Sequence, residues 1–107
     1  MAFRQGDIVE VNFEPTLGHE PKKLRPALVV SSNDFNDMTS MTIVCPITSK
    51  DDGFFLHEPI PLGHDVSGFV VMEQIRAIDL AARKAAVIDH LDNNEMISII
   101  TCIKTFM

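Results

Sequence analysis

Hydrophobic and polar positions alternate over short distances along the chain, and this pattern predicts many short β-strands. In residues 6–13 (GDIVEVNF), Val9, Val11 and Phe13 fall on one face with mostly polar residues between them, which predicts a half-buried strand. Further strands are predicted at residues 25–32, 40–48, 54–63, 67–80 and 84–91, separated by turns. Pro46 removes a hydrogen-bond donor from its strand, so an edge or a bulge is predicted there.

The period of the apolar positions changes near the C-terminus. Residues 92–106 (DNNEMISIITCIKTF) repeat apolar side chains at helical spacing, which predicts an amphipathic helix of about four turns. Asp92 followed by Glu95 three residues later predicts the N-cap of this helix. The expected fold is therefore one domain over residues 1–107, mainly β, with a small twisted antiparallel sheet or barrel and a C-terminal α-helix packed on it.

The composition suggests a globular protein with an acidic surface. The chain has nine Lys and Arg residues and 15 Asp and Glu residues, which gives a net charge of −6. A protein that binds nucleic acid usually has a basic surface instead. No segment approaches the roughly 18 apolar residues that a membrane helix needs. The first residues lack the apolar stretch of a secretory signal, so a cytoplasmic protein without membrane association is expected.

The cysteines and most histidines predict no metal or cofactor site. Cys45 and Cys102 each lie in an apolar neighbourhood and are expected to be free thiols packed like small hydrophobic residues. His57, His64 and His90 are scattered along the chain without metal-ligand spacing, and they are expected at the surface or as capping groups.

Arg25 and Thr48 are candidates for chemistry because of where they lie on predicted strands. Arg25 begins an apolar strand (RPALVV), and its planar guanidinium suits a phosphate or carboxylate, although from its spacing alone a structural ion pair or an exposed arginine is the more common explanation. Thr48 ends another strand (VCPIT), and its hydroxyl can donate to a phosphate oxygen. Threonine is also common in strands for reasons of packing alone.

The polar stretch EQIRAID is predicted to continue the strand at 67–80. It places Glu73 on one face and Gln74 and Arg76 on the other. This density of polar groups fits an exposed edge strand or a strand that lines a groove, and the pattern does not choose between them.

Four segments together resemble the MazF/PemK/Kid toxins of bacterial toxin–antitoxin modules. GDIVEVNFEPTLGHE, RPALVVSSNDFN, VCPITSK and VVMEQIRAIDLAARK occur in collinear order between Gly6 and Lys84. The resemblance implies an SH3-like barrel, shared with the gyrase poison CcdB, that forms a homodimer and is silenced by a MazE-like antitoxin. It also implies sequence-specific, metal-independent cleavage of single-stranded mRNA, with 2′,3′-cyclic phosphate and 5′-hydroxyl ends.

The resemblance also implies roles for particular residues. Arg25 and Thr48 match the family's catalytic pair, and His19, Glu20 and Glu73 are alternative general bases. Residues expected to bind substrate are Gly18, Lys22, Lys23, Ser49, Lys50, Glu73, Gln74 and Arg76. Some family members carry an arginine where this chain has Val71, so a mechanism that uses that arginine as proton donor cannot operate here.

Two other functions fit the same fold. One is a CcdB-like, non-enzymatic poison of DNA gyrase, although the C-terminal segment ISIITCIKTFM lacks the aromatic end expected for that activity. The other is a catalytically inactive interaction module. The net charge of −6 also leaves open whether the RNA groove is locally basic.

Overall fold

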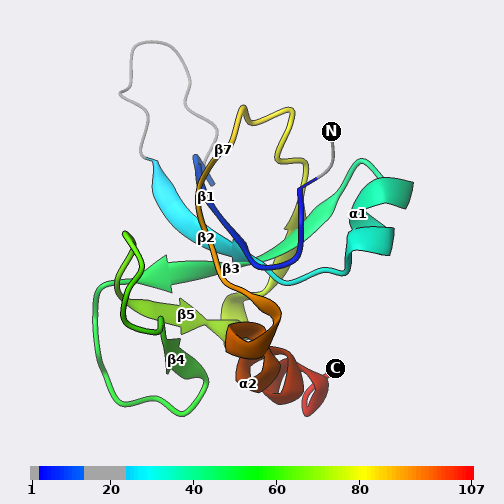
Figure 1. The fold of residues 1–107 in the computed structure, drawn as a ribbon. Coiled ribbons are helices and arrows are strands. Elements are labelled where there is room, and N and C mark those ends of the chain that lie inside the picture. The colour runs from blue at the N-terminus through cyan, green and yellow to red at the C-terminus, as the bar shows by residue number, and fades with distance from the viewer. Residues whose placement is uncertain (1–2, 14–23) are drawn as a thin grey trace.

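The computed structural model describes residues 3–13 and 24–107. In this part of the chain, short strands come first and a long helix comes last (Figure 1). The elements are β1 Asp7–Val11, β2 Arg25–Val29, α1 Asn33–Met38, β3 Thr42–Thr48, β4 His57–Pro59, β5 Phe69–Val71, the 3-10 turn η1 Met72–Gln74, β6 Arg76–Ile78, β7 Ala86–His90 and α2 Asn93–Lys104. Within the described residues, no helix is long and apolar enough to cross a membrane.

The seven strands form one antiparallel sheet. Its order is β4-β5-β3-β2-β1-β7, and β6 pairs with the first half of β3. The sheet is strongly twisted, and α2 lies against the part that contains β3, β4 and β5 (Figure 1). The predicted fold, a small twisted antiparallel β structure with a C-terminal α-helix, is therefore confirmed.

Both faces of the central strands are buried. Ile8 faces a cluster that includes the α2 residues Met96, Ile99 and Ile103, and the adjacent Val9 faces a second cluster. This second cluster contains Val9, Val11, Ala27, Val29, Val44, Ile78 and Leu80, with Phe3, Phe13 and Ala85 packed against it. The prediction that residues 6–13 form a half-buried strand is wrong, because distant segments cover the face that was expected to be exposed.

The long strand predicted at 67–80 is interrupted by η1. Val30 donates a hydrogen bond to the Ile43 carbonyl, so the backbone groups of Ile43 point toward β2. In an antiparallel ladder this direction alternates along the strand, and the nitrogen of Pro46, three residues later, therefore points to the side of β3 away from β2. That edge pairs with β5 and β6 on either side of Pro46, and Pro46 has no N–H to donate between them. The neighbouring segment forms η1 at this gap, so Glu73 and Gln74 lie on a turn rather than on opposite faces of a strand. The edge or bulge predicted at Pro46 is therefore not what forms there: β3 is a central strand, and the ladder on one of its sides is interrupted between β5 and β6.

Helix α2 begins where the sequence predicts. The Asp92 side chain accepts a hydrogen bond from the Glu95 N–H, and the Glu95 side chain accepts one from the Asp92 N–H, which makes a complete capping box. Ile97 and Phe106 were expected on the apolar face, but they are 60% and 41% exposed. The buried face is therefore narrower than the pattern of apolar residues indicates.

Two further predictions concern residues around the core. The strand predicted at 54–63 shortens to β4, since Pro59 and Pro61 cannot donate to a ladder. Cys45 and Cys102 are free, as predicted. Burial raises the pKa of the Cys45 thiol to about 12, so this residue stays a neutral, packed side chain.

Candidate functional site

A pocket of about 470 Å³ opens where β2 begins and β3 ends. It combines cationic, hydroxyl and apolar side chains from four parts of the chain. The lining residues are Arg25, Pro26, Pro46, Ile47, Thr48, Ser49, Lys50, Asp52, His57, Ser67, Val71 and Gln74. Since this volume falls within the usual range for small-ligand sites, the pocket is a candidate binding site.

The pocket opens because β2 and β3 separate at a proline. Their register pairs Ala27 with Pro46, and Pro26 and Ile47 would form the next hydrogen-bonded pair. Pro26 has no N–H to donate, so the ladder loses a bond at that position. Beyond it, β3 pairs with β5, with Ile47 opposite Val70. The space between the diverging strands becomes the pocket.

Arg25 and Thr48 lie on this pocket together. Extending the β2–β3 register by two residues places Arg25 opposite Thr48 on the same face. Arg25 is exposed, and within the described part of the chain it is in no ion pair. The Thr48 hydroxyl oxygen accepts a hydrogen bond from the Lys50 N–H at 3.2 Å, which leaves its own proton to be donated elsewhere. This arrangement suits an anionic ligand such as a phosphate.

A glycine brings β5 close to Thr48. Gly68 has φ +131°, and a Cβ atom on it would lie 2.5 Å from the Thr48 carbonyl oxygen. Only glycine fits this backbone conformation and this close approach. Gly68 therefore helps to fix the end of β3 that carries Thr48.

The structure brings together some of the residues expected to bind substrate. Ser49, Lys50 and Gln74 line the same pocket as Arg25 and Thr48. Glu73 lies beside it, hydrogen-bonded to His57. Arg76 is not in the lining, and its guanidinium carbon lies 5.4 Å from the centre of the Phe13 ring. The remaining predicted site residues, Gly18, His19, Glu20, Lys22 and Lys23, lie outside the described residues.

His57 is a pocket residue that the sequence did not reveal. Its Nδ1 lies 2.9 Å from Asp52 Oδ1 and its Nε2 lies 2.9 Å from Glu73 Oε2. The hydrogen bond to Glu73 is the largest of the effects that raise the pKa of His57 above its ordinary value of 6.5. Its side chain is only 10% exposed, so the expectation of a surface histidine is wrong here. No local motif signals this, since the two partners come from separate segments.

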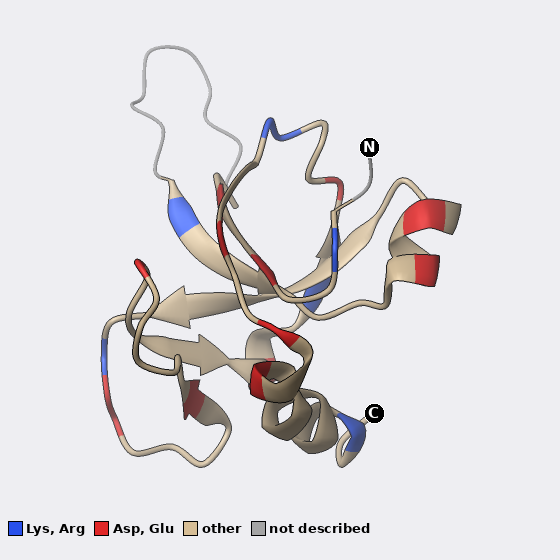
Figure 2. Ribbon diagram, in the orientation of Figure 1, with Lys and Arg blue, Asp and Glu red and all other residues tan. Residues whose placement is uncertain are grey.

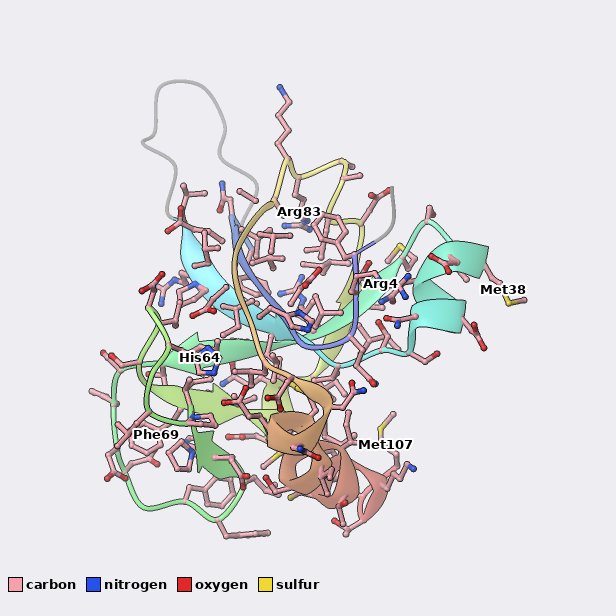
Figure 3. All side chains as sticks on the ribbon, in the orientation of Figure 1. Arg4, Met38, His64, Phe69, Arg83 and Met107 are labelled. Atoms are coloured by element: carbon pink, nitrogen blue, oxygen red, sulfur yellow. The ribbon has the colours of Figure 1, made fainter. Side chains whose placement is uncertain are left out.

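The other two histidines have different surroundings. The His64 side chain is 14% exposed and contacts Asp89 and Glu95, so the expectation of a surface position is wrong for it as well. Figure 3 labels His64 near the arrowhead of β3, to the left of α2 in that view. His90 is half exposed and lies 2.8 Å from Asp7 Oδ1, in agreement with a surface position.

The charge around the pocket differs from that of the whole chain. Acidic positions are spread over α1, the N-terminal end of α2 and several loops, and basic positions are fewer (Figure 2). In the pocket lining, however, Arg25 and Lys50 are cationic and Asp52 is the acidic residue, with Glu73 next to the lining on His57. Within residues 3–13 and 24–107, no group of three or more His, Cys, Asp or Glu side chains could hold a metal ion. Fold and pocket together define a small β protein with a site suited to a phosphate.

Comparison with protein families places the chain in one family. Residues 4–107 match the family described as PemK-like, MazF-like toxin of type II toxin–antitoxin system. The chain belongs to this family, as its sequence motifs indicate.

Curated relatives carry names of one enzyme class. The chain is 44% identical over 89 residues to the endoribonuclease toxin ChpB of Escherichia coli K12, covering 78% of this chain and 75% of ChpB. It is 34% identical over 80 residues to the endoribonuclease toxin MazF of the same strain, covering 75% of this chain and 71% of MazF. These relatives are endoribonucleases.

Solved structures support the same fold. A MazE–MazF crystal structure from Deinococcus radiodurans matches with a TM-score of 0.85 and 28% identity, covering 98% of this chain and 95% of that one. A MazF crystal structure from the same organism matches with a TM-score of 0.82 and 28% identity, covering 98% and 96%.

Proposed function

We propose that this chain is the toxin of a type II toxin–antitoxin module and cleaves single-stranded mRNA at specific sequences without a metal ion. The observation that carries the proposal is that Arg25 and Thr48, which come from different strands, line one pocket. The names of the curated relatives support an endoribonuclease. The proposed substrate is cytoplasmic, so we expect the protein to act in the cytoplasm.

The proposed reaction uses the RNA's own nucleophile. The 2′-OH gives its proton to a base and attacks the adjacent phosphorus. The bond to the 5′ oxygen breaks and this oxygen takes a proton from water, which leaves a 2′,3′-cyclic phosphate and a 5′-hydroxyl. Arg25 stabilises the negative charge that develops on the phosphorane oxygens, since a guanidinium group does not act as a proton donor in proteins. Thr48 donates a further hydrogen bond to the same oxygens. A metal ion has no necessary part in this scheme.

The base that removes the 2′-OH proton comes from the three candidates His19, Glu20 and Glu73. Of these, only Glu73 lies within the described residues. One of its carboxylate oxygens is already hydrogen-bonded to His57, so Glu73 is less free to accept the proton of the 2′-OH. This favours His19 or Glu20 as the base.

We also propose a homodimer and a MazE-like antitoxin partner. Structures similar to this chain include MazE–MazF complexes from Deinococcus radiodurans. The positive charges of the pocket lining suit an acidic segment of an antitoxin as well as an RNA phosphate.

The test is cleavage of a long single-stranded RNA in excess EDTA, followed by mapping of the new ends. Discrete cuts with 5′-hydroxyl and cyclic phosphate ends are expected, and a matching substrate with a single 2′-deoxy nucleotide at the mapped site should stay intact. RNA that remains intact under all conditions would contradict the proposal. Trapping of gyrase on DNA would then identify a poison instead.

A further inference from the structure

His57 is held between two carboxylates at the wall of the pocket. Both of its ring nitrogens lie 2.9 Å from a carboxylate oxygen, one of Asp52 and one of Glu73. An ionised carboxylate only accepts hydrogen bonds, so both ring nitrogens must donate. Neutral histidine has one N–H, and only the imidazolium has two. The geometry therefore describes a positively charged histidine between two negative groups.

The bridge joins two segments that form the pocket. Asp52 belongs to the loop between β3 and β4, His57 begins β4, and Glu73 lies on η1. The Phe54 ring meets the His57 ring edge to face, with 5.2 Å between ring centres, and covers another side of it. His57 thus ties the loop that carries Lys50 to the turn that carries Gln74.

The charged groups around His57 are of both signs. Asp52 and Glu73 contact it directly, and Arg25 and Lys50 line the same pocket. The neighbouring carboxylate of β4, Glu58, accepts a hydrogen bond from Ser98 of α2 instead. From β3, Cys45 is an uncharged thiol at neutral pH, because burial raises its pKa to about 12. Loss of the proton from His57 would remove the positive charge that offsets one of these two carboxylates, beside Arg25.

We propose that His57 is a positioning residue for the RNA cleavage proposed above: as an imidazolium it offsets one of the two negative charges of Asp52 and Glu73, so that a phosphodiester can lie against Arg25 and Thr48. This inference rests on the proposed function for the reaction itself. Its physical content is about binding, because a phosphate is repelled by nearby carboxylates that lack a counter-charge. It also gives the acidic chain a means of keeping this one pocket positive.

The first experiment measures binding and cleavage across pH with the protein, a long single-stranded RNA and an uncleavable single-stranded DNA oligonucleotide. The pKa of His57 is raised, so its charge is complete below about pH 6.5 and is lost as the pH rises through the raised value. Binding of both probes should weaken over that range in the wild-type protein. In His57→Gln, affinity below about pH 6.5 should fall by about tenfold and this part of the pH dependence should disappear.

A rescue variant separates neutralisation from other roles. Changing Asp52→Asn and Glu73→Gln on top of His57→Gln removes the two negative charges as well as the positive one. Affinity should return toward the wild-type value and stay level with pH. If the triple variant stays as weak as His57→Gln, the histidine acts by donating a proton or by shaping the loop, and the inference is wrong.

The chain provides a matched control in His64. It also bridges two carboxylates, Asp89 and Glu95, but it lies outside the pocket lining. His64→Gln should keep the wild-type pH dependence of oligonucleotide binding. A change as large as that of His57→Gln would overturn the inference, since it would reflect general loosening of the fold.

Two further measurements separate the test of the His57 charge from the test of the nuclease function. An NMR titration of the His57 ring in the unmodified protein should give a pKa above 6.5, and a value at or below 6.5 would contradict the imidazolium. If RNA stays intact while DNA binding shows the expected pH dependence, the proposed nuclease function fails and the charge role of His57 stands. If RNA is cut and His57→Gln keeps the wild-type pH profile, the nuclease function stands and the charge role of His57 is wrong.

Discussion

The protein contains two histidine bridges of the same chemistry in two different settings. His57 lies between Asp52 and Glu73 at the pocket, and His64 lies between Asp89 and Glu95 where β7 meets α2. The carboxylates at the pocket are 58% and 34% exposed, whereas those around His64 are 18% and 24% exposed. The carboxylates that pair with histidine are thus more exposed at the pocket, where a ligand enters, than around His64.

The two bridges also differ in what else holds their carboxylates. Asp89 accepts hydrogen bonds from the N–H groups of Asp65 and His90, and Glu95 accepts one from Asp92. These bonds persist if His64 loses its proton. At the pocket, Asp52 likewise accepts a hydrogen bond from the Phe54 N–H, but the hydrogen bond that the structure shows for the Glu73 carboxylate, among the described residues, is the one with His57. We conclude that the His64 bridge supports the fold, while the His57 bridge controls the charge of the pocket.

The largest effect should come from removing the guanidinium of the pocket. Arg25→Ala should lower the RNA cleavage rate by roughly 10²–10³-fold or more, because it removes a donor to the charged transition state. The melting temperature should hardly change, since Arg25 is exposed and in no ion pair within the described residues. A quantitative cleavage assay and a thermal melt measure the two.

Arg4 is the matched control for this change. Its side chain is 54% exposed, and the ion pair that it makes among the described residues is a long contact of 3.8 Å with Asp37, away from the pocket. Arg4→Ala should therefore cut RNA at the wild-type rate. If Arg25→Ala unfolds, or if both variants lose activity equally, Arg25 has no special role in the reaction.

A somewhat smaller effect is expected at Thr48. Thr48→Val keeps the shape of the side chain and removes the hydroxyl, so the cleavage rate should fall by roughly 10²-fold. Thr48→Ser keeps the hydroxyl and should retain most of the activity. Equal losses in both variants, measured under the same single-turnover conditions, would indicate that Thr48 acts through packing at the end of β3.

A change near the His64 bridge, where β7 meets α2, should lower the stability of the fold and leave the RNA cleavage rate unchanged. Asp92→Ala removes half of the capping box beside His64 and should lower the free energy of unfolding by about 1 kcal/mol. Urea denaturation measures this change. The cleavage rate well below the melting temperature should equal that of the wild type, and a large loss would mean that α2 contributes to the site.

The sequence predicted those features that depend on local pattern. The helical period and the Asp92–Glu95 spacing placed α2 because a helix and its cap are defined by neighbouring residues. Arg25 and Thr48 could be paired in advance only through the family resemblance. Their proximity depends on β2 and β3 being neighbours that separate at Pro26, which the residue pattern alone does not show.

Features that depend on distant contacts could not be predicted. The burial of Ile8, on the face of β1 that was expected to be exposed, requires side chains from well beyond that strand, such as Met96 of α2. The break at η1 follows from a proline on a different strand, Pro46. His57 has no motif, because its partners Asp52 and Glu73 meet only after β4 and η1 have packed together.

The smallest effect is expected in the pH dependence of stability. The hydrogen bonds to Glu73 and to Glu95 raise the pKa of His57 and of His64, respectively, above 6.5. The resulting stabilisation is complete below about pH 6.5 and is lost as the pH rises through the raised values. At the acidic end, hydrogen bonds from the Phe54 backbone and from His64 lower the pKa of Asp52 and of Asp89, respectively, from 3.8. Their contribution is lost as the pH falls through the lowered values.

Urea denaturation between about pH 6 and about pH 9 should distinguish the two bridges. The free energy of unfolding of the wild-type protein should decline over this range, and His57→Gln and His64→Gln should each reduce the decline. The reduction should be larger for His64→Gln, because water screens its less exposed carboxylates less strongly. An equal or larger reduction for His57→Gln would contradict the division of roles, since the pocket histidine would then contribute at least as much to the fold.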